Sequence, residues 1–389
     1  MIPGIALRRS PFVFASILLL LVGMWGGLLR LGWNFAGPAA SVPYHGPLMI
    51  GGFLGTLISL ERAVALGHPW VYGAPLAAAL GAIAILVGLP LPFGQGLLAL
   101  ASVLLFLAMV LIFFRQREVF IVVMTLGALA WLAGNLLWLF GRPVSIVVPL
   151  WAAFLVLTIV GERLELSRFL PFSHLRLPTF NGVISLYLLG LLLTIWLPGL
   201  GLGILGFGQL LLAQWLFTFD LARHTIRRNG LPRFTAACLL TGYFWLALSG
   251  ALSLYYGLIW PAFVAPDGWL LFAPSAGLIY DAILHSLLLG FVIGMIFGHA
   301  PIIFPAVMRI RITYRPRFYS HLALLQISVA LRVASDLAGS SPGRKWAGTL
   351  NVITLLLFLL NTITSVRFPN REQYPPRDDK EFISLKIVG

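Results

Sequence analysis

The chain is a succession of long apolar runs separated by short polar or Pro/Gly-rich breaks. A run of roughly 20 apolar residues is long enough to cross the hydrocarbon core of a bilayer as a helix. Twelve runs reach about that length: 11–29, 43–62, 70–90, 94–114, 118–140, 145–164, 179–198, 200–220, 234–256, 276–306, 318–338 and 346–366. The pattern predicts an all-α polytopic membrane protein with about twelve transmembrane helices in residues 1–368. A polar cytoplasmic tail is expected at 369–389.

Composition excludes a soluble protein. Of the 389 residues 60% are hydrophobic and 10% are charged, whereas soluble domains have about 25% charged residues. The single cysteine, Cys238, lies inside an apolar run, which excludes a disulfide framework and a cysteine-ligated metal cluster. The net charge of +14 lies largely in the loops between the apolar runs. It therefore indicates contact with the anionic surface of a lipid bilayer and no binding of nucleic acid.

The basic residues predict the orientation. If the N-terminus is cytoplasmic, 21 of the 26 Lys and Arg residues fall in cytoplasmic segments and one, Arg332, falls inside a helix. The outer segments hold only Arg30, Arg142, Arg344 and Lys345. Because basic loops stay on the cytoplasmic side, we expect both termini to be cytoplasmic. The expected location is the cell membrane of a bacterium or archaeon, with multiple passes.

Histidines are the most informative polar residues, because ionisable groups within membrane spans are rare and tend to be functional. Three of the seven histidines fall in loops beside arginines and are expected to be ordinary solvated residues: His68, His174 and His224. Four fall in predicted spans: His45, His285, His299 and His321.

His45 and His285 are expected at one depth. Each lies about seven residues outward of the middle of its helix, which is roughly 10 Å at the rise of an α-helix. Two imidazoles so placed can ligate a b-type haem, and the glycines that follow His45 leave room for a flat group. Asp281, one turn before His285, is a candidate to orient that ring. The alternative is that both histidines make ordinary helix–helix hydrogen bonds.

A motif adds to this interpretation. Residues 45–50, His-Gly-Pro-Leu-Met-Ile, resemble the start of helix 2 in subunit I of the haem-copper oxidases. His285 with Phe304-Pro305 downstream resembles helix 10 of that family. The resemblance implies an oxidase-like bundle in which His45 and His285 ligate the iron of one low-spin haem b, near Met49. It also implies that Arg344-Lys345 correspond to the paired arginines near the haem propionates.

The departures from the family matter equally. Ile283 stands where the axial histidine of the high-spin haem would be, and predicted helices 6 and 7 lack the histidines of the copper site. What remains resembles the low-spin half of an oxidase core and the NnrS family, multi-span proteins implicated in nitric oxide stress. The resemblance implies electron transfer or a nitric-oxide-stress role, with a protein or quinol as redox partner. Whether the chain is an enzyme stays open.

A second metal site is a further hypothesis. His299 follows His285 by fourteen residues, which places it on the same helix face about 21 Å deeper. His321 begins the next helix on that side, so a second haem or a copper ion could lie between the two, with Met295 and Met308 as further copper ligands. The alternative is a pair of interfacial histidines.

Three charged pairs are predicted to be structural. Arg332 and Asp336 are four residues apart on one helix, which favours an ion pair, although they could also serve a propionate. Glu61-Arg62 and Glu162-Arg163 each end a predicted helix at the cytoplasmic boundary. An ion pair that helps to end each helix is the favoured interpretation, and proton entry is the alternative.

Two other functions fit twelve helices. A secondary transporter commonly has this number of helices with both ends inside, but usually places ionisable residues at the membrane midplane. An assembly or scaffold subunit would need neither haem nor substrate. A coloured purified protein separates the haem hypothesis from both alternatives, and co-purification with a larger complex would favour the scaffold.

Overall fold

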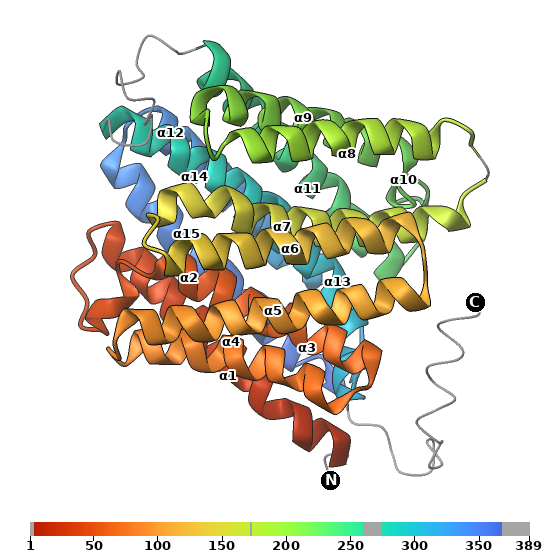
Figure 1. The fold of residues 1–389 in the computed structure, drawn as a ribbon, viewed down its shortest axis with the longest axis horizontal. Coiled ribbons are helices and arrows are strands. Elements are labelled where there is room, and N and C mark those ends of the chain that lie inside the picture. The colour runs from red at the N-terminus through yellow and green to blue at the C-terminus, as the bar shows by residue number, and fades with distance from the viewer. Residues whose placement is uncertain (1–3, 172, 260–273, 368–389) are drawn as a thin grey trace.

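The computed structural model describes residues 4–171, 173–259 and 274–367, and the tail predicted at 369–389 lies outside this range. The described part is a bundle of long helices (Figure 1). The prediction of an all-α polytopic protein is thereby confirmed at the level of fold class.

Most spans are single helices: α1 (Gly4–Arg30), α4 (Gly73–Leu86), α5 (Leu91–Arg115), α6 (Val119–Leu139), α7 (Val144–Leu166), α8 (Arg176–Leu193), α9 (Pro198–Phe219), α11 (Leu231–Leu254), α14 (Phe318–Leu337) and α15 (Ser341–Ile363). Two are composite. The first consists of α2 (His45–Pro47), the π-helix η2 (Leu48–Leu54) and α3 (Gly55–Leu66). The second consists of α12 (Pro274–His285), the π-helix η8 (Ser286–Ile293) and α13 (Gly294–Met308).

Two short elements connect the spans, η1 (Ala39–Ser41) and α10 (Ala222–Thr225). Three others extend them: η3 (Pro69–Tyr72) precedes α4, η4 (Ser167–Phe169) follows α7, and the π-helix η5 (Tyr255–Ile259) follows α11. Strands β1 (Arg311–Ile312) and β2 (Val366–Arg367) pair antiparallel, with Arg311 opposite Arg367. This small sheet ties the segment after α13 to the segment after α15.

Eleven helices within the described residues are long and apolar enough to cross a membrane. The remaining predicted run, 318–338, is helical as α14 but is not among the eleven. Its polar side chains, which include His321, Arg332 and Asp336, lower its hydropathy. Ten of its residues are nevertheless buried within the bundle, so its polar groups are covered mainly by protein.

The outer surface of the bundle is apolar. Phe14 is 70% exposed, Phe114 65% and Leu360 59%. Large apolar areas of this kind mark an interaction surface, and the hydrocarbon of a bilayer covers them on all sides of a polytopic protein.

Helices that follow one another in sequence pack as antiparallel neighbours, as in α4–α5, α6–α7, α8–α9 and α14–α15 (Figure 1). Backbones approach closely between α9 and α11, where a Cβ on Gly250 would lie 2.7 Å from the carbonyl oxygen of Gly206. Small residues permit such contact where lipid gives no hydrophobic driving force between helices.

The two ends of the bundle can be told apart by cross-helix contacts. Arg9 near the start of α1 donates to the carbonyl of Val307 near the end of α13 at 2.7 Å, and we call this end the N-terminal side. At the other end, the distal side, Gly32 just after α1 lies beside Lys345 at the start of α15.

Candidate functional site

The two composite helices share an irregularity beside their histidines. His45 begins α2, and the π-helix η2 starts three residues later. His285 ends α12, and the π-helix η8 starts at the next residue. π-Helical turns are rare and occur frequently at functional sites. Each of the two histidines therefore lies shortly before a π-helix within its span.

Helix α1 holds the ring of His45. The Nδ1–H of His45 donates to the carbonyl oxygen of Gly23 at 2.6 Å. A Cβ on Gly27 would lie only 3.0 Å from Cε1 of the same imidazole, so the absence of a side chain there gives the ring its place. Arg30, Asp281 and His285 all act electrostatically on His45, which indicates that the two histidines lie in the same region of the bundle.

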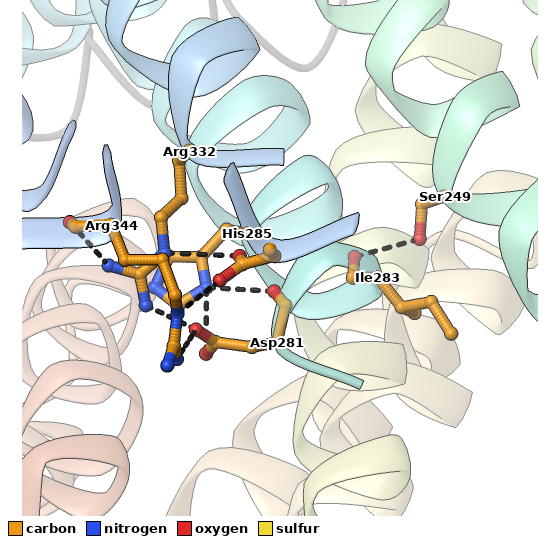
Figure 2. A network of polar contacts seen from close by, with 7 residues as sticks. Ser249, Asp281, Ile283, His285, Arg332 and Arg344 are labelled. Carbon is orange, nitrogen blue, oxygen red and sulfur yellow. Dashed lines mark hydrogen bonds and ion pairs between the residues drawn. The ribbon is translucent and has the colours of Figure 1, made fainter. Parts of the chain in front are cut away.

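His285 belongs to a polar network (Figure 2). Its Nδ1–H donates to the carbonyl oxygen of Asp281 at 2.8 Å, and Nδ1 lies 3.1 Å from the Oδ1 of that carboxylate. The predicted orienting role of Asp281 thus agrees with the geometry. Arg344 donates to Asp281 Oδ2 at 2.9 Å and to Asp336 Oδ1 at 2.6 Å.

Arg332 completes the network from α14. It donates to Asp336 Oδ2 at 3.1 Å, which confirms the predicted ion pair, and it also contacts Asp281. Two guanidinium groups balance two carboxylates, and the side chains of Arg332 and Asp336 are 5% and 0% exposed. Buried charges are tolerated only when paired in this way.

The same network offers a set of metal ligands. One ligand atom each from Asp281, His285 and Asp336 lies within 4.8 Å of the others. Both carboxylates are already hydrogen-bonded by arginines, however, and the positive charge of Arg332 and Arg344 opposes a divalent cation. The arrangement therefore favours an imidazole oriented by a neutralised carboxylate over a cation held by three ligands.

Both rings use Nδ1 for their described hydrogen bonds, which leaves Nε2 as the atom that can ligate iron. Metal-ligating histidines normally donate their other ring N–H to a carboxylate or backbone carbonyl. The acceptor for His45 is a backbone carbonyl on another helix, Gly23, which no side-chain pattern reveals.

The remaining predicted haem contacts lie at separate places. Met49 packs against α1, where a Cβ on Gly23 would lie 2.7 Å from its sulfur. Arg344 is turned into the polar network, whereas Lys345 Nζ lies 5.9 Å from the ring centre of Trp33. Arg344 and Lys345 thus provide two cationic groups at the distal side, one of them beside the His285 network.

His299 and His321 have different surroundings. The Nδ1–H of His299 donates to the carbonyl of Met295 at 2.7 Å. His321 instead accepts at Nδ1 from the amide of Asn361 at 3.1 Å, and its ring centre lies 4.8 Å from that of Phe297. The hydrogen bonds and ring contacts described for the two rings involve different neighbours, and a haem or copper site between them stays a prediction.

The two Glu-Arg pairs meet at the N-terminal side. Arg62 of α3 donates to Glu162 of α7 and lies 3.6 Å from Glu61. Arg163 pairs instead with Asp220, just after α9, at 3.6 Å. Burial raises the pKa of the Asp220 carboxyl, and the charge of Arg163 opposes that rise. The arginines of both Glu-Arg dipeptides therefore form ion pairs with other helices or their ends. The sequence predicted instead that each dipeptide would help to end its own helix.

The chain belongs to a family of unknown function. A family model described as a domain of unknown function, DUF8744, matches residues 9–367, which include every described helix except the first residues of α1. A comparison with curated proteins gave no match.

Proposed function

We propose that this protein binds one low-spin haem b between Nε2 of His45 and Nε2 of His285, in the distal half of the bundle, and functions in electron transfer. The observation that supports this most strongly is the shared geometry of the two rings. Each donates its Nδ1–H to a backbone carbonyl, and each lies beside a π-helix.

The residues present fit the group. Two imidazoles that donate through Nδ1 and leave Nε2 to bind iron are the donor set of a low-spin haem. Gly46, next to His45, has no atom within 4 Å of the place where a Cβ would be, so the backbone beside this ring leaves open space. The ammonium of Lys345 is a suitable partner for an anionic propionate.

Held by His45 and His285, a haem would supply reversible one-electron transfer at this site. The chain's own residues orient the rings and increase their donor strength. The carbonyl of Gly23 does so for His45, and Asp281 does so for His285. Arg332 and Arg344 both contact the Asp281 carboxylate and so hold it in place. We propose that the redox partner, a protein or a quinol, docks within electron-transfer reach of this site. A role in nitric oxide stress is proposed from the resemblance to the NnrS family.

The test is a reduced-minus-oxidised absorption spectrum of the purified protein, with haem quantified after extraction. We expect a low-spin b-type spectrum that is lost in His45→Ala and in His285→Ala. His68→Ala is the matched control, because His68 is exposed in the loop after α3. A colourless protein expressed with ample haem, or a spectrum unchanged in both variants, would overturn the proposal. Colourless protein with substrate-dependent transport would favour the transporter.

A further inference from the structure

A partly enclosed cavity lies toward the N-terminal side of the bundle, and its lining includes neither His45 nor His285. It is bounded by α1, by the η2–α3 and η8–α13 parts of the composite helices, and by α7 and α15. Along η8–α13 the lining extends from Val292 to Val307, which is about 22 Å at the rise of an α-helix. The volume of the cavity is about 130 Å³. Over this length it is therefore a narrow tunnel, which fits a flexible chain better than a flat ring.

The wall of the cavity is apolar apart from four side chains: Thr158, His299, Glu61 and Glu162. The first two hydrogen-bond to carbonyl oxygens of their own helices. Arg62 contacts both glutamates, so each carboxylate has a cationic partner. Arg163, which acts electrostatically on His299, lies 3.6 Å from the carboxylate of Asp220. The charged groups near the wall are thus paired within the protein, and most of the wall suits a hydrocarbon occupant.

Arginines lie where the cavity reaches the N-terminal side. Arg9 precedes the lining residue Val13 by one turn of α1 and donates to the carbonyl oxygen of Val307 at 2.7 Å. Arg311 follows Val307 by four residues and lies on β1, directly opposite Arg367 on β2, and both side chains are exposed. Like charges directly opposite each other in an antiparallel pair are destabilising. An anion bound between the two guanidinium groups removes this repulsion and gains charge-assisted hydrogen bonds.

We propose that this cavity binds one acyl chain of an anionic phospholipid, whose phosphate is held at the N-terminal side by Arg9, Arg311 and Arg367. The cavity is long enough for one chain, because the hydrocarbon part of a leaflet is about 15 Å thick. The planar guanidinium group matches the geometry of a phosphate, and the positive charge of the three arginines complements an anionic headgroup. This lipid site goes beyond the proposed haem site, and its binding chemistry does not depend on haem.

The experiment titrates lipid onto the delipidated full chain in detergent and counts the bound molecules by native mass spectrometry. The probes are phosphatidylglycerol, which is anionic, and phosphatidylcholine with the same acyl chains, which is zwitterionic. We expect one saturable site for phosphatidylglycerol and binding of phosphatidylcholine about tenfold weaker. An excess of inorganic phosphate should not displace the lipid. Displacement by phosphate would show that the arginines bind a free anion, and it would overturn the proposal.

Two pairs of variants test the headgroup and the chain separately. Arg311→Gln/Arg367→Gln should lower the affinity for phosphatidylglycerol to that for phosphatidylcholine. Arg227→Gln/Arg228→Gln, at two exposed positions between α10 and α11, should leave it unchanged. Ile303→Trp fills the cavity and should abolish the saturable site, whereas Ile302→Trp, at a position of the same helix that is 52% exposed, should retain it.

Equal affinity of the wild-type protein for the two lipids would overturn the proposal without any variant. Unchanged binding in Ile303→Trp, or an equal loss in the two arginine double variants, would also overturn it. Failure of the haem proposal is separate, since His45→Ala removes the spectrum and should leave phosphatidylglycerol binding intact.

Discussion

The two composite helices carry different groups of polar side chains at the distal side and at the N-terminal side of the bundle. At the distal end His45 and His285 are both fixed through Nδ1, and the second lies in a network of two arginines and two aspartates. At the N-terminal end a single histidine, His299, lines an apolar cavity, and its charged neighbours include two glutamates with one shared arginine.

The difference follows from charge balance and space. At the distal end two carboxylates pair with two guanidinium groups, so that this network has no net charge and its side chains are held in place. Such a site suits a group that stays bound and is held from two sides. The other end has one imidazole, His299, in the wall of an otherwise largely apolar cavity.

The largest effect is expected at the distal network. Asp336→Leu leaves the buried Arg332 without one of its two carboxylates and should destabilise the protein by about 3–5 kcal/mol. The measurement is denaturant or thermal unfolding of the purified protein. The double variant Arg332→Leu/Asp336→Leu should recover part of the loss, because both members of the pair are gone. A cost below about 1 kcal/mol for the single variant would show that Arg344 and Asp281 suffice.

The next effect concerns the place of the His45 ring. Gly27→Val puts a side chain where a Cβ would lie 3.0 Å from the imidazole, and overpacking of this kind costs about 1–3 kcal/mol. Because the imidazole of His45 is displaced, the Gly27→Val protein should also lose the low-spin haem spectrum. Gly96→Val is the control, since a Cβ there meets no atom within 4 Å. Retention of the full spectrum in Gly27→Val would contradict the proposed role of α1.

A smaller effect is expected at the N-terminal side. Glu162→Gln removes one of the two carboxylates that contact Arg62, and Glu61 remains at 3.6 Å. Because these side chains are partly exposed, we expect a loss of about 1 kcal/mol in unfolding free energy. The haem spectrum should stay unchanged, and a changed spectrum would contradict the separation of the two ends.

The smallest effect is expected at Lys345, whose ammonium lies over the ring of Trp33. Lys345→Gln should cost about 0.5–1 kcal/mol, the range of an exposed cation–π contact. The same substitution in a Trp33→Leu background should have no further effect on stability. An equal cost in both backgrounds would exclude the ring contact as its cause.

Part of the candidate site was visible in the sequence. Histidines in apolar runs, the four-residue spacing of Arg332 and Asp336, and Asp281 one turn before His285 each depend on local helical geometry. Other features were not visible. The expected single helix over 276–306 contains the π-helix Ser286–Ile293, because an apolar run of one to two turns does not show where the backbone hydrogen bonds change from the α to the π pattern. The ion pairs of Arg344 with Asp281 and of Arg62 with Glu162 join helices that are far apart in the sequence. They depend on how those helices pack side by side, which the sequence does not show.

The sequence by itself determined that this is a helical protein of the membrane, because hydrophobic length is a local property that the bilayer selects directly. It also determined which rare polar side chains had to be accommodated within it. Only the tertiary structure decided how the rings of His45 and His321 are hydrogen-bonded. A backbone carbonyl on α1 binds His45, and an amide on α15 binds His321. Those partners come from other helices, and their positions follow from packing that no single run of residues encodes.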